Sequence, residues 1–329
     1  MYVTSSPYGF NEEQLYVDLG PTLGTSLFLK IEGLNFAGSV KVKAALEMVE
    51  EAEREGLLDE DSIIVESSSG NLGVALSMIC ASKGYDFLCV VDPRCNPSTK
   101  ALMETLGARV HEVSEPHPVD GFLGARLNCV RNLCASSPRY VWLNQYESPG
   151  NWGAHYRHTG PEIAAAFPNL DVLFVGAGTT GTLMGCARYF KDQAHPVRIV
   201  AVDAVGSVSF GGPPARRLLP GLGMAVVPPQ LDVTYVDEVV MVDEVDTVRT
   251  CHRMAARGFL FGGSTGTVVS GAVQWLSDHG NPDVTAVALS PDLGGRYLDT
   301  LYSTDWLLDN YGADVLPDQV RRLHASSAA

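Results

Sequence analysis

The stretch SIIVESSSGNLGVALSMICASKGYDFLCVV (residues 62–91) decides the fold. It begins with an apolar run at 62–65, turns through serines and glycines into a segment with helical spacing, and ends in a second apolar run at 87–91. Short, wholly apolar strands separated by a helix are typical of a parallel sheet that helices cover on both faces. The stretch therefore predicts a βαβ unit of an α/β fold.

The same alternation continues along the rest of the chain. Further apolar runs are ARVHEV (108–113), YVWL (140–143), DVLFVG (171–176), RIVAVDA (198–204), EVVMVDE (238–244) and VTAVALS (284–290). The strands fall into two groups, which predict two doubly wound, parallel-sheet lobes. Residues 206–232 are rich in Gly and Pro, and their apolar residues follow neither the helical nor the strand spacing. We therefore predict a functional loop there.

Composition places the chain among ordinary globular proteins. It has 329 residues, of which 46% are hydrophobic and 19% are charged, and no apolar run reaches the roughly 18 residues of a membrane span. The first residues, MYVTSSPYGFNEE, have neither a basic start nor an apolar core, and the seven cysteines are scattered. We therefore expect a cytoplasmic protein with no membrane contact. The net charge of −15 argues against a nucleic-acid partner.

Lys41 occupies an unusual place for a lysine. In GLNFAGSVKVKAAL (33–46) it follows a flexible turn and opens a predicted helix, which Gly56 ends. A charged amine there would meet the positive end of the helix dipole, so the position disfavours an ordinary surface lysine and favours a neutral amine. We expect Lys41 to have a functional role.

Three loops rich in small residues lead into predicted helices. In open α/β sheets, ligands bind beyond the carboxyl ends of the strands. SSSGNLG (67–73) offers donors to a carboxylate, GAGTTGT (176–182) has the features of a phosphate cup, and GGSTGT (262–267) places the Ser264 hydroxyl for a heteroaromatic nitrogen. Taken alone, the first and third are explained as well by helix caps. The second lacks the lysine of a P-loop, and its glycines alone are weak evidence for a dinucleotide site.

Lys41 and the three loops together meet the needs of one cofactor. Pyridoxal 5'-phosphate (PLP) requires an amine for a Schiff base, an anchor for its phosphate and a partner for its pyridine nitrogen. A hydroxyl at that nitrogen, unlike a carboxylate, is expected to leave the ring largely unprotonated.

We expect no metal site. His155 and His158 lie three residues apart and have no further ligands nearby, so a structural use of these histidines is expected.

The order of these motifs resembles a known family. GSVK, SSSGNLG, NQYESPGNWGAHYRHTGPEI, GAGTTGT and GGSTGT follow one another as in the cysteine synthase and cystathionine beta-synthase group of fold-type II PLP enzymes, over about residues 16–306. The resemblance implies the tryptophan synthase beta-like fold and a homodimer. We expect a smaller lobe of residues 38–145 with the first ten or so, a larger, phosphate-binding lobe of residues 11–37 and 146–320, and a disordered tail at 321–329.

Other segments are similar to a narrower family within this group, the N-(2-amino-2-carboxyethyl)-L-glutamate synthases. They are ESSSGNLGVALSMI, VVDPR, WLNQY, VDAVGSVSFG, LPGLG and RYLDTLYSTDWL. The similarity implies a β-replacement on O-phospho-L-serine, through an aminoacrylate, with L-glutamate as the amine nucleophile. The product is a precursor of the 2,3-diaminopropionate of siderophores and peptide antibiotics.

Other functions share most of these motifs. A cysteine synthase would use sulfide with O-acetylserine or O-phosphoserine, and a dehydratase or a threonine synthase would share the fold. A non-catalytic module that binds the cofactor or a partner is an alternative of a different class. The intact Lys41 argues against that last alternative.

The resemblance also implies roles for individual residues. Lys41 is expected to form the Schiff base and to carry the α-proton. Further cofactor contacts are expected from Asn71 at the ring oxygen, from Ser264 at the ring nitrogen, and at the phosphate from Gly178, Thr179, Thr180, Gly181 and Thr182. Contacts with the substrates are expected from Ser68, Ser69 and Gln145 at the carboxylate, and from Arg126 and Tyr146 at the leaving phosphate and the second substrate. Arg216 and Arg217, on the long loop, are a second choice for the phosphate.

The chain departs from the family's pattern around Lys41. The pattern NPxGSxKDR reads NFAGSVKVK, so that Phe36, Val42 and Lys43 replace a proline, an aspartate and an arginine. Lys43 is therefore a rival for the Schiff base, but the lysine of the pattern lies two residues after the serine, which selects Lys41. Gly178 stands where the narrower family can have a serine, so the recognition of the second substrate need not carry over.

Overall fold

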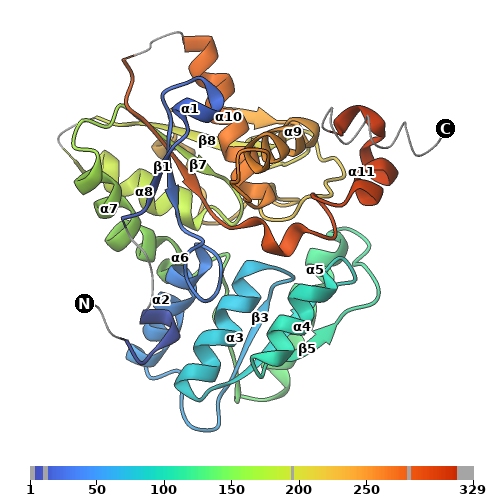
Figure 1. The fold of residues 1–329 in the computed structure, drawn as a ribbon. Helices are drawn as coiled ribbons and strands as arrows, with labels where there is room; N and C mark the ends of the chain where they lie inside the picture. Colours follow the sequence, from blue (N-terminus) through green and yellow to red (C-terminus); the bar gives the residue numbers. More distant parts are fainter. Residues whose placement is uncertain (1–3, 10–13, 194–195, 280–282, 317–329) are drawn as a thin grey trace.

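The computed structural model describes residues 4–9, 14–193, 196–279 and 283–316, and these ranges contain two sheets (Figure 1). The smaller sheet has the strand order β5-β4-β3-β6, and all of its neighbours are parallel. Its strands are β3 (Ile63–Ser67), β4 (Asp86–Val91), β5 (Arg109–Glu112) and β6 (Tyr140–Trp142). The strands predicted between residues 62 and 143 are thus confirmed.

The larger sheet has the strand order β1-β2-β10-β7-β8-β9. Its strands are β1 (Tyr16–Asp18), β2 (Phe28–Ile31), β7 (Val172–Gly176), β8 (Arg198–Ala204), β9 (Glu238–Val242) and β10 (Ala286–Ser290). The pairs are parallel except for β1 and β2, which are antiparallel. The sequence did not predict this edge pair, because β1 is only three residues long and the buried Lys30 interrupts the apolar pattern of β2.

Helices connect the parallel strands and cover the sheets. Their bounds are α1 (Gly20–Leu23), α2 (Lys41–Arg54), α3 (Asn71–Lys83), α4 (Pro97–Thr105), α5 (Gly121–Ser136), α6 (Pro149–Ala154), α7 (Gly160–Ala166), α8 (Gly181–Lys191), α9 (Glu244–Ala255), α10 (Gly263–His279) and α11 (Thr304–Tyr311). A π-helical turn spans His155–Thr159, and short 3-10 turns span Pro7–Gly9, Val233–Tyr235, Gly294–Tyr297 and Ala313–Val315. As predicted, α2 begins at Lys41, and Gly56 lies just beyond its end with a φ of 69°.

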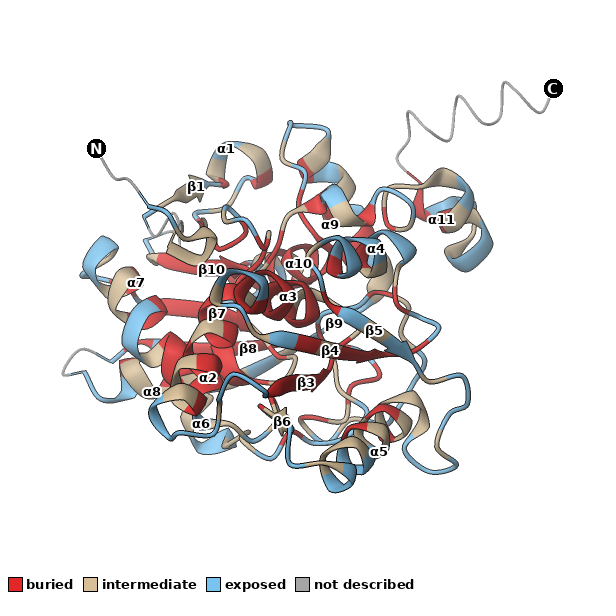
Figure 2. Cartoon of the chain, turned by 90° about the horizontal axis from the view of Figure 1, so that it is seen from below, coloured by how far each residue is buried: buried red, intermediate tan, exposed pale blue. Residues whose placement is uncertain are grey.

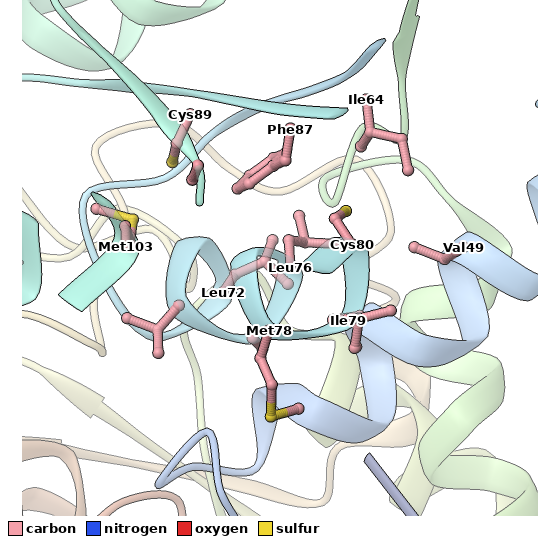
Figure 3. Packing of buried hydrophobic residues seen from close by; sticks show 14 of the residues in the cluster. Val49, Ile64, Leu72, Leu76, Met78, Ile79, Cys80, Phe87, Cys89 and Met103 are labelled. Atoms are coloured by element: carbon pink, nitrogen blue, oxygen red, sulfur yellow. The ribbon is translucent and has the colours of Figure 1, made fainter. Parts of the chain in front are cut away.

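The core of the smaller sheet lies against α3. Residues 72–80 of this helix are all buried, and Figure 2 shows α3 in the buried centre of the molecule. In Figure 3, Phe87 and Cys89 of β4 face Leu72 on α3. A side-chain carbon at Gly73 would lie 2.6 Å from the Met103 sulfur, so the helix packs closely here. This packing fixes the start of α3 and the loop before it.

The larger sheet has an equally apolar core. Figure 2 shows β7 among the buried elements, and its residues Val172–Val175 are all buried. The two sheets draw on separate parts of the chain, but the exact lobe boundaries stay a prediction, and the predicted tail at 321–329 lies outside the described residues. Among the residues that are described, no helix has the length and hydropathy that crossing a membrane requires.

Candidate active site

A cavity of about 520 Å³ lies at the carboxyl ends of β3 and β7. Its volume falls within the roughly 300–1,000 Å³ that is usual for small-molecule sites. The predicted site residues that line it are Lys41, Ser68, Ser69, Asn71, Arg126, Gln145, Tyr146, Gly178, Thr179, Thr180, Gly181, Thr182 and Ser264. The structure therefore brings these residues to one place, whereas Arg216 and Arg217, the second choice for the phosphate, do not line the cavity.

Lys41 is the first residue of α2 and is partly buried in the cavity wall. Protein atoms surround its amine closely, and this burial lowers the pKa of Lys41 to about 8, although the nearby Asp292 carboxylate acts in the opposite direction. A much larger share of this amine is neutral at physiological pH than for an ordinary lysine, whose pKa is about 10.4. Lys41 is thus suited to attack an aldehyde.

The lowered pKa of Lys41 predicts how the cofactor-free protein captures PLP. The rate is expected to rise with pH through about 8 and to level off above it, because only the neutral amine reacts. The measurement is the change in visible absorbance after mixing with PLP over a series of pH values, with free N-acetyl-lysine as the control. A rate that keeps rising until about pH 10, as expected for an ordinary lysine, would contradict the prediction.

Lys43 belongs to a buried ion cluster and does not line the cavity. Its Nζ atom lies 2.7 Å from Glu162 Oε2 and 3.1 Å from Glu32 Oε1, and Lys30 Nζ lies 2.8 Å from the same Glu162 oxygen. Burial by itself would raise the pKa of Glu162, but the two ammonium groups outweigh it and the pKa is lowered. The charge of Lys43 is therefore committed to two carboxylates, which leaves Lys41 as the amine of the cavity.

The predicted phosphate loop joins β7 to α8. Thr180, directly before α8, has a φ of 68°, a left-handed conformation that is uncommon outside glycine. Asn151 fixes the loop, because its Nδ2 atom donates to Gln145 O at 2.6 Å and to Thr179 Oγ1 at 3.3 Å. The first N–H groups of a helix have no partner within the helix, so the start of α8 is suited to bind an anion.

The predicted functional loop packs against this phosphate loop. Gly223 N–H donates to Ala177 O at 2.9 Å, and a side-chain carbon at Gly178 would lie 2.6 Å from Gly221 O. A serine at position 178 would therefore require the loop to move. Arg216 and Arg217 do not line the cavity, and Arg217 instead donates to the carbonyl oxygens of its own loop.

A chain of hydrogen bonds links the phosphate loop to the ion cluster. His155 Nδ1 lies 2.9 Å from Thr159 Oγ1, and His155 Nε2 lies 3.1 Å from Thr182 Oγ1. Lys43 donates to Thr159 Oγ1 at 3.4 Å, which continues the chain from the ring to the ion cluster. Burial lowers the pKa of His155 well below its ordinary value, which keeps the ring neutral. The structural use expected for His155 is thus a link between these two parts of the fold.

The loop at residues 67–73 is held by its own side chains. Ser68 Oγ accepts from Gly73 N–H at 3.0 Å, and Gln145 Nε2 donates to Ser67 O at 2.9 Å. Below it, burial raises the pKa of Glu66 to about 7, while N–H donors from Ser67, Trp142 and Gln145 act in the opposite direction. The loop therefore has a fixed shape at the N-terminus of α3.

Arg126 is a buried cation at the edge of this loop. Its Nε atom lies 3.1 Å from Asp92 Oδ2, and its Nη1 atom donates to Ser69 Oγ at 3.2 Å. The side chain is only 11% exposed, whereas Arg94, which also pairs with Asp92, is 65% exposed. Burial raises the pKa of Tyr146 to about 12, so its hydroxyl is neutral beside the guanidinium.

Ser264 and Asn71 both donate hydrogen bonds to Asp292, a residue that the sequence patterns did not single out. Ser264 Oγ donates to Asp292 Oδ1 at 2.7 Å, and Asn71 Nδ2 donates to Asp292 Oδ2 at 2.9 Å. Asp292 lies two residues after β10. Its place just beyond the carboxyl end of a predicted strand could have indicated it as a site residue. Asn151, under the phosphate loop, lies in a helix and gave no comparable signal.

The residues around the cavity fit PLP by their chemistry. Lys41 provides an amine with a lowered pKa, and the glycine-rich start of α8 provides N–H groups that are suited to bind an anion. Ser264 provides a hydroxyl that is only 3% exposed yet lines the cavity. These are the three features that the sequence predicted for this cofactor.

Comparisons with known proteins agree with this fit. The model of the pyridoxal-phosphate dependent enzyme family matches residues 15–292. The chain is 41% identical over 283 residues to the N-(2-amino-2-carboxyethyl)-L-glutamate synthase of Ralstonia nicotianae, covering 85% of this chain and 83% of the relative. It is 41% identical over 287 residues to the enzyme of the same name from Cupriavidus metallidurans, covering 85% and 84%.

The fold agrees as well. The chain superposes on the crystal structure of O-ureido-L-serine synthase with a TM-score of 0.85 and 31% identity, covering 97% of this chain and 99% of the other. The expected α/β, fold-type II architecture and the expected cofactor are thus confirmed. The chain belongs to the family of pyridoxal-phosphate dependent enzymes.

Proposed function

We propose that the enzyme replaces the phosphate of O-phospho-L-serine by the amine of L-glutamate, giving N-(2-amino-2-carboxyethyl)-L-glutamate and phosphate. The name shared by the relatives at 41% identity supports this product. In such a product, the glutamate nitrogen is bonded to the β-carbon of a three-carbon amino-acid unit. A β-replacement on a serine derivative forms that bond directly.

The observation that carries the proposal is a buried arginine in the same cavity as Lys41. The whole protein has a net charge of −15 and repels anions, so a dianionic leaving group needs a local cation. Arg126 is the cation proposed for this role, because its guanidinium lines the cavity and bonds to Ser69 inside the loop proposed to bind the substrate carboxylate. Its partner Asp92 is shared with Arg94, so two guanidinium groups face one carboxylate there. Charge-assisted hydrogen bonds from a guanidinium to a phosphate are roughly twice as strong as neutral hydrogen bonds.

The other residues have distinct tasks in this proposal. The cofactor, when bound, supplies an electron sink for the negative charge that develops at the substrate α-carbon. Lys41 holds the cofactor covalently in the resting enzyme and, once released, takes the α-proton as general base. The loop containing Ser68 and Ser69 binds the substrate carboxylate, and the start of α8 binds the cofactor phosphate. Tyr146, neutral beside Arg126, donates to the leaving phosphate or to the second substrate.

Replacing Arg126 by alanine is expected to raise the KM for O-phosphoserine by about 10- to 100-fold, since a hydrogen bond to a charged group contributes about 1.5–3 kcal/mol. Asp92 keeps Arg94 as its partner in this variant, so the fold should be retained. Steady-state kinetics of phosphate release measure the effect. The matched control is Arg131→Ala, an exposed arginine on the same helix α5, whose KM should stay within about twofold. Equal effects of the two substitutions would show that Arg126 does not bind the phosphate.

The choice of nucleophile tests the proposed function itself. The holoenzyme is incubated with O-phosphoserine and either L-glutamate or sulfide, and phosphate release and the amino-acid product are measured. Glutamate is expected to support turnover with a product of the mass of N-(2-amino-2-carboxyethyl)-L-glutamate. Turnover with sulfide alone would instead identify a cysteine synthase, and release of a keto acid without either nucleophile would identify a dehydratase.

Two further expectations stay predictions. The resemblance predicts a homodimer, which light scattering of the purified protein can test. It also predicts that the product is used to make the 2,3-diaminopropionate of siderophores or peptide antibiotics.

A further inference from the structure

Asp299 is the only acidic residue among the described residues that line the cavity. It lies two residues after the 3-10 turn Gly294–Tyr297 and is exposed, which places its carboxylate at the mouth of the cavity. Within the ranges that the structure describes, this carboxylate has neither an ion pair nor a hydrogen bond. The entrance of an otherwise neutral or cationic cavity therefore carries one unpaired negative charge.

The arginines of the same cavity have other partners. Three of them line it, namely Arg94, Arg126 and Arg296. The first two pair with Asp92, and Arg296 Nη2 donates to Ala37 O at 2.5 Å. Arg296 and Asp299 thus do not pair, although they lie only three positions apart. The carboxylate of Asp299 is accessible to a cation that enters from solution.

A positive group is exposed at the same rim. The guanidinium of Arg94 lines the cavity and belongs to the segment that follows β4. Asn96 Nδ2 donates to Arg296 O at 3.4 Å, so the segment of Arg94 adjoins the segment of Asp299. The rim therefore presents charges of both signs. An amino acid carries an ammonium group and a carboxylate, so it is complementary to this pattern.

The charges of the two nucleophiles under consideration differ. The amine of L-glutamate is an ammonium ion at neutral pH, and a carboxylate attracts it. Hydrosulfide, the nucleophile of a cysteine synthase, is an anion, and the same carboxylate repels it. Specificity is a difference between two affinities, and a single charge at the entrance acts on both of them in the same direction. A free carboxylate at the mouth therefore favours an amine over sulfide.

We propose that Asp299 binds the ammonium group of the second substrate at the mouth of the cavity and so selects an amine as the nucleophile. The inference rests on the proposed function, because it requires glutamate as the second substrate. An ammonium ion has no lone pair, and at the exposed Asp299 it can lose one proton to water. The nitrogen lone pair then forms the bond to the β-carbon from which the phosphate has left, and Lys41 returns its proton to the α-carbon. Arg94 offers a positive group to a carboxylate of the same molecule.

The experiment measures each substrate separately in the PLP-loaded enzyme. In Asp299→Asn, the KM for L-glutamate is expected to rise about 5- to 10-fold, an effect between that of an exposed ion pair and that of a buried charged hydrogen bond. The KM for O-phosphoserine should stay within about twofold of the wild-type value. The change in visible absorbance that O-phosphoserine causes without glutamate should also match the wild type. Asp299→Glu, which keeps the charge, should restore most of the affinity for glutamate.

Asp309→Asn is the matched control, because Asp309 is an exposed aspartate on α11 that does not line the cavity. Both of its KM values should stay within about twofold of the wild type. An unchanged KM for glutamate in Asp299→Asn, an equal rise of both KM values, or an equal loss in Asp299→Glu would overturn the inference and leave the proposed function standing. A wild-type enzyme that makes no product from glutamate would overturn the proposed function and this inference with it.

Discussion

Replacing Lys41 by alanine is expected to lower kcat/KM with O-phosphoserine and glutamate by at least about 10³-fold, because the same amine both holds the cofactor and moves the α-proton. The loss should appear mainly in kcat, since the loops that bind the substrate carboxylate and the cofactor phosphate are untouched. Initial rates of phosphate release, measured with saturating PLP, give the effect.

The control for this variant is Lys191→Ala. Lys191 is partly exposed on α8 and pairs with Asp237 away from the proposed active site, so this variant should keep wild-type activity to within about twofold. A Lys41→Ala enzyme with more than about a tenth of the wild-type rate would be incompatible with Lys41 as the general base.

Replacing Lys43 by methionine is expected to destabilise the protein by about 3–5 kcal/mol. In the ion cluster, Glu32 and Glu162 each pair with both Lys30 and Lys43, so the substitution leaves two carboxylates with one lysine. The lost bond to Thr159 would also loosen the hydrogen-bond chain to Thr182. Urea unfolding of the cofactor-free protein, followed by circular dichroism, gives the change in the free energy of unfolding.

Lys191→Met is the matched substitution at an exposed ion pair, where about 0–1 kcal/mol is expected. If both methionine variants unfold at the same urea concentration as the wild type, the cluster does not stabilise the fold. The Lys43→Met enzyme should still form the covalent bond with PLP, which distinguishes a structural lysine from a rival for the Schiff base.

The sequence was sufficient for the features that depend on neighbouring residues. The parallel strands were predicted because each is a short apolar run before a helix, and the start of α2 at Lys41 followed from the turn before it. The loops were found because the carboxyl ends of parallel strands meet at one edge. Their contacts with the cofactor stay predictions, although the structure brings them around one cavity.

The features that the sequence did not predict depend on contacts between distant residues. Asp292 meets Ser264 and Asn71 across 28 and 221 positions, and no local pattern indicates such a pairing. The ion cluster likewise brings Lys43 to Glu162, 119 positions away. Arg217 was considered for the phosphate because of its charge, but the local backbone turns it toward Gly206 O. In each case the partner, rather than the residue type, decides the role.

The central claim is that PLP is bonded to Lys41. It is tested most directly by treating the PLP-loaded protein with borohydride, digesting it and locating the modified lysine by tandem mass spectrometry, which separates Lys41 from Lys43 within one peptide. We predict a reduced pyridoxyl group on Lys41 alone. A modification on Lys43, or none on either lysine, would contradict the claim.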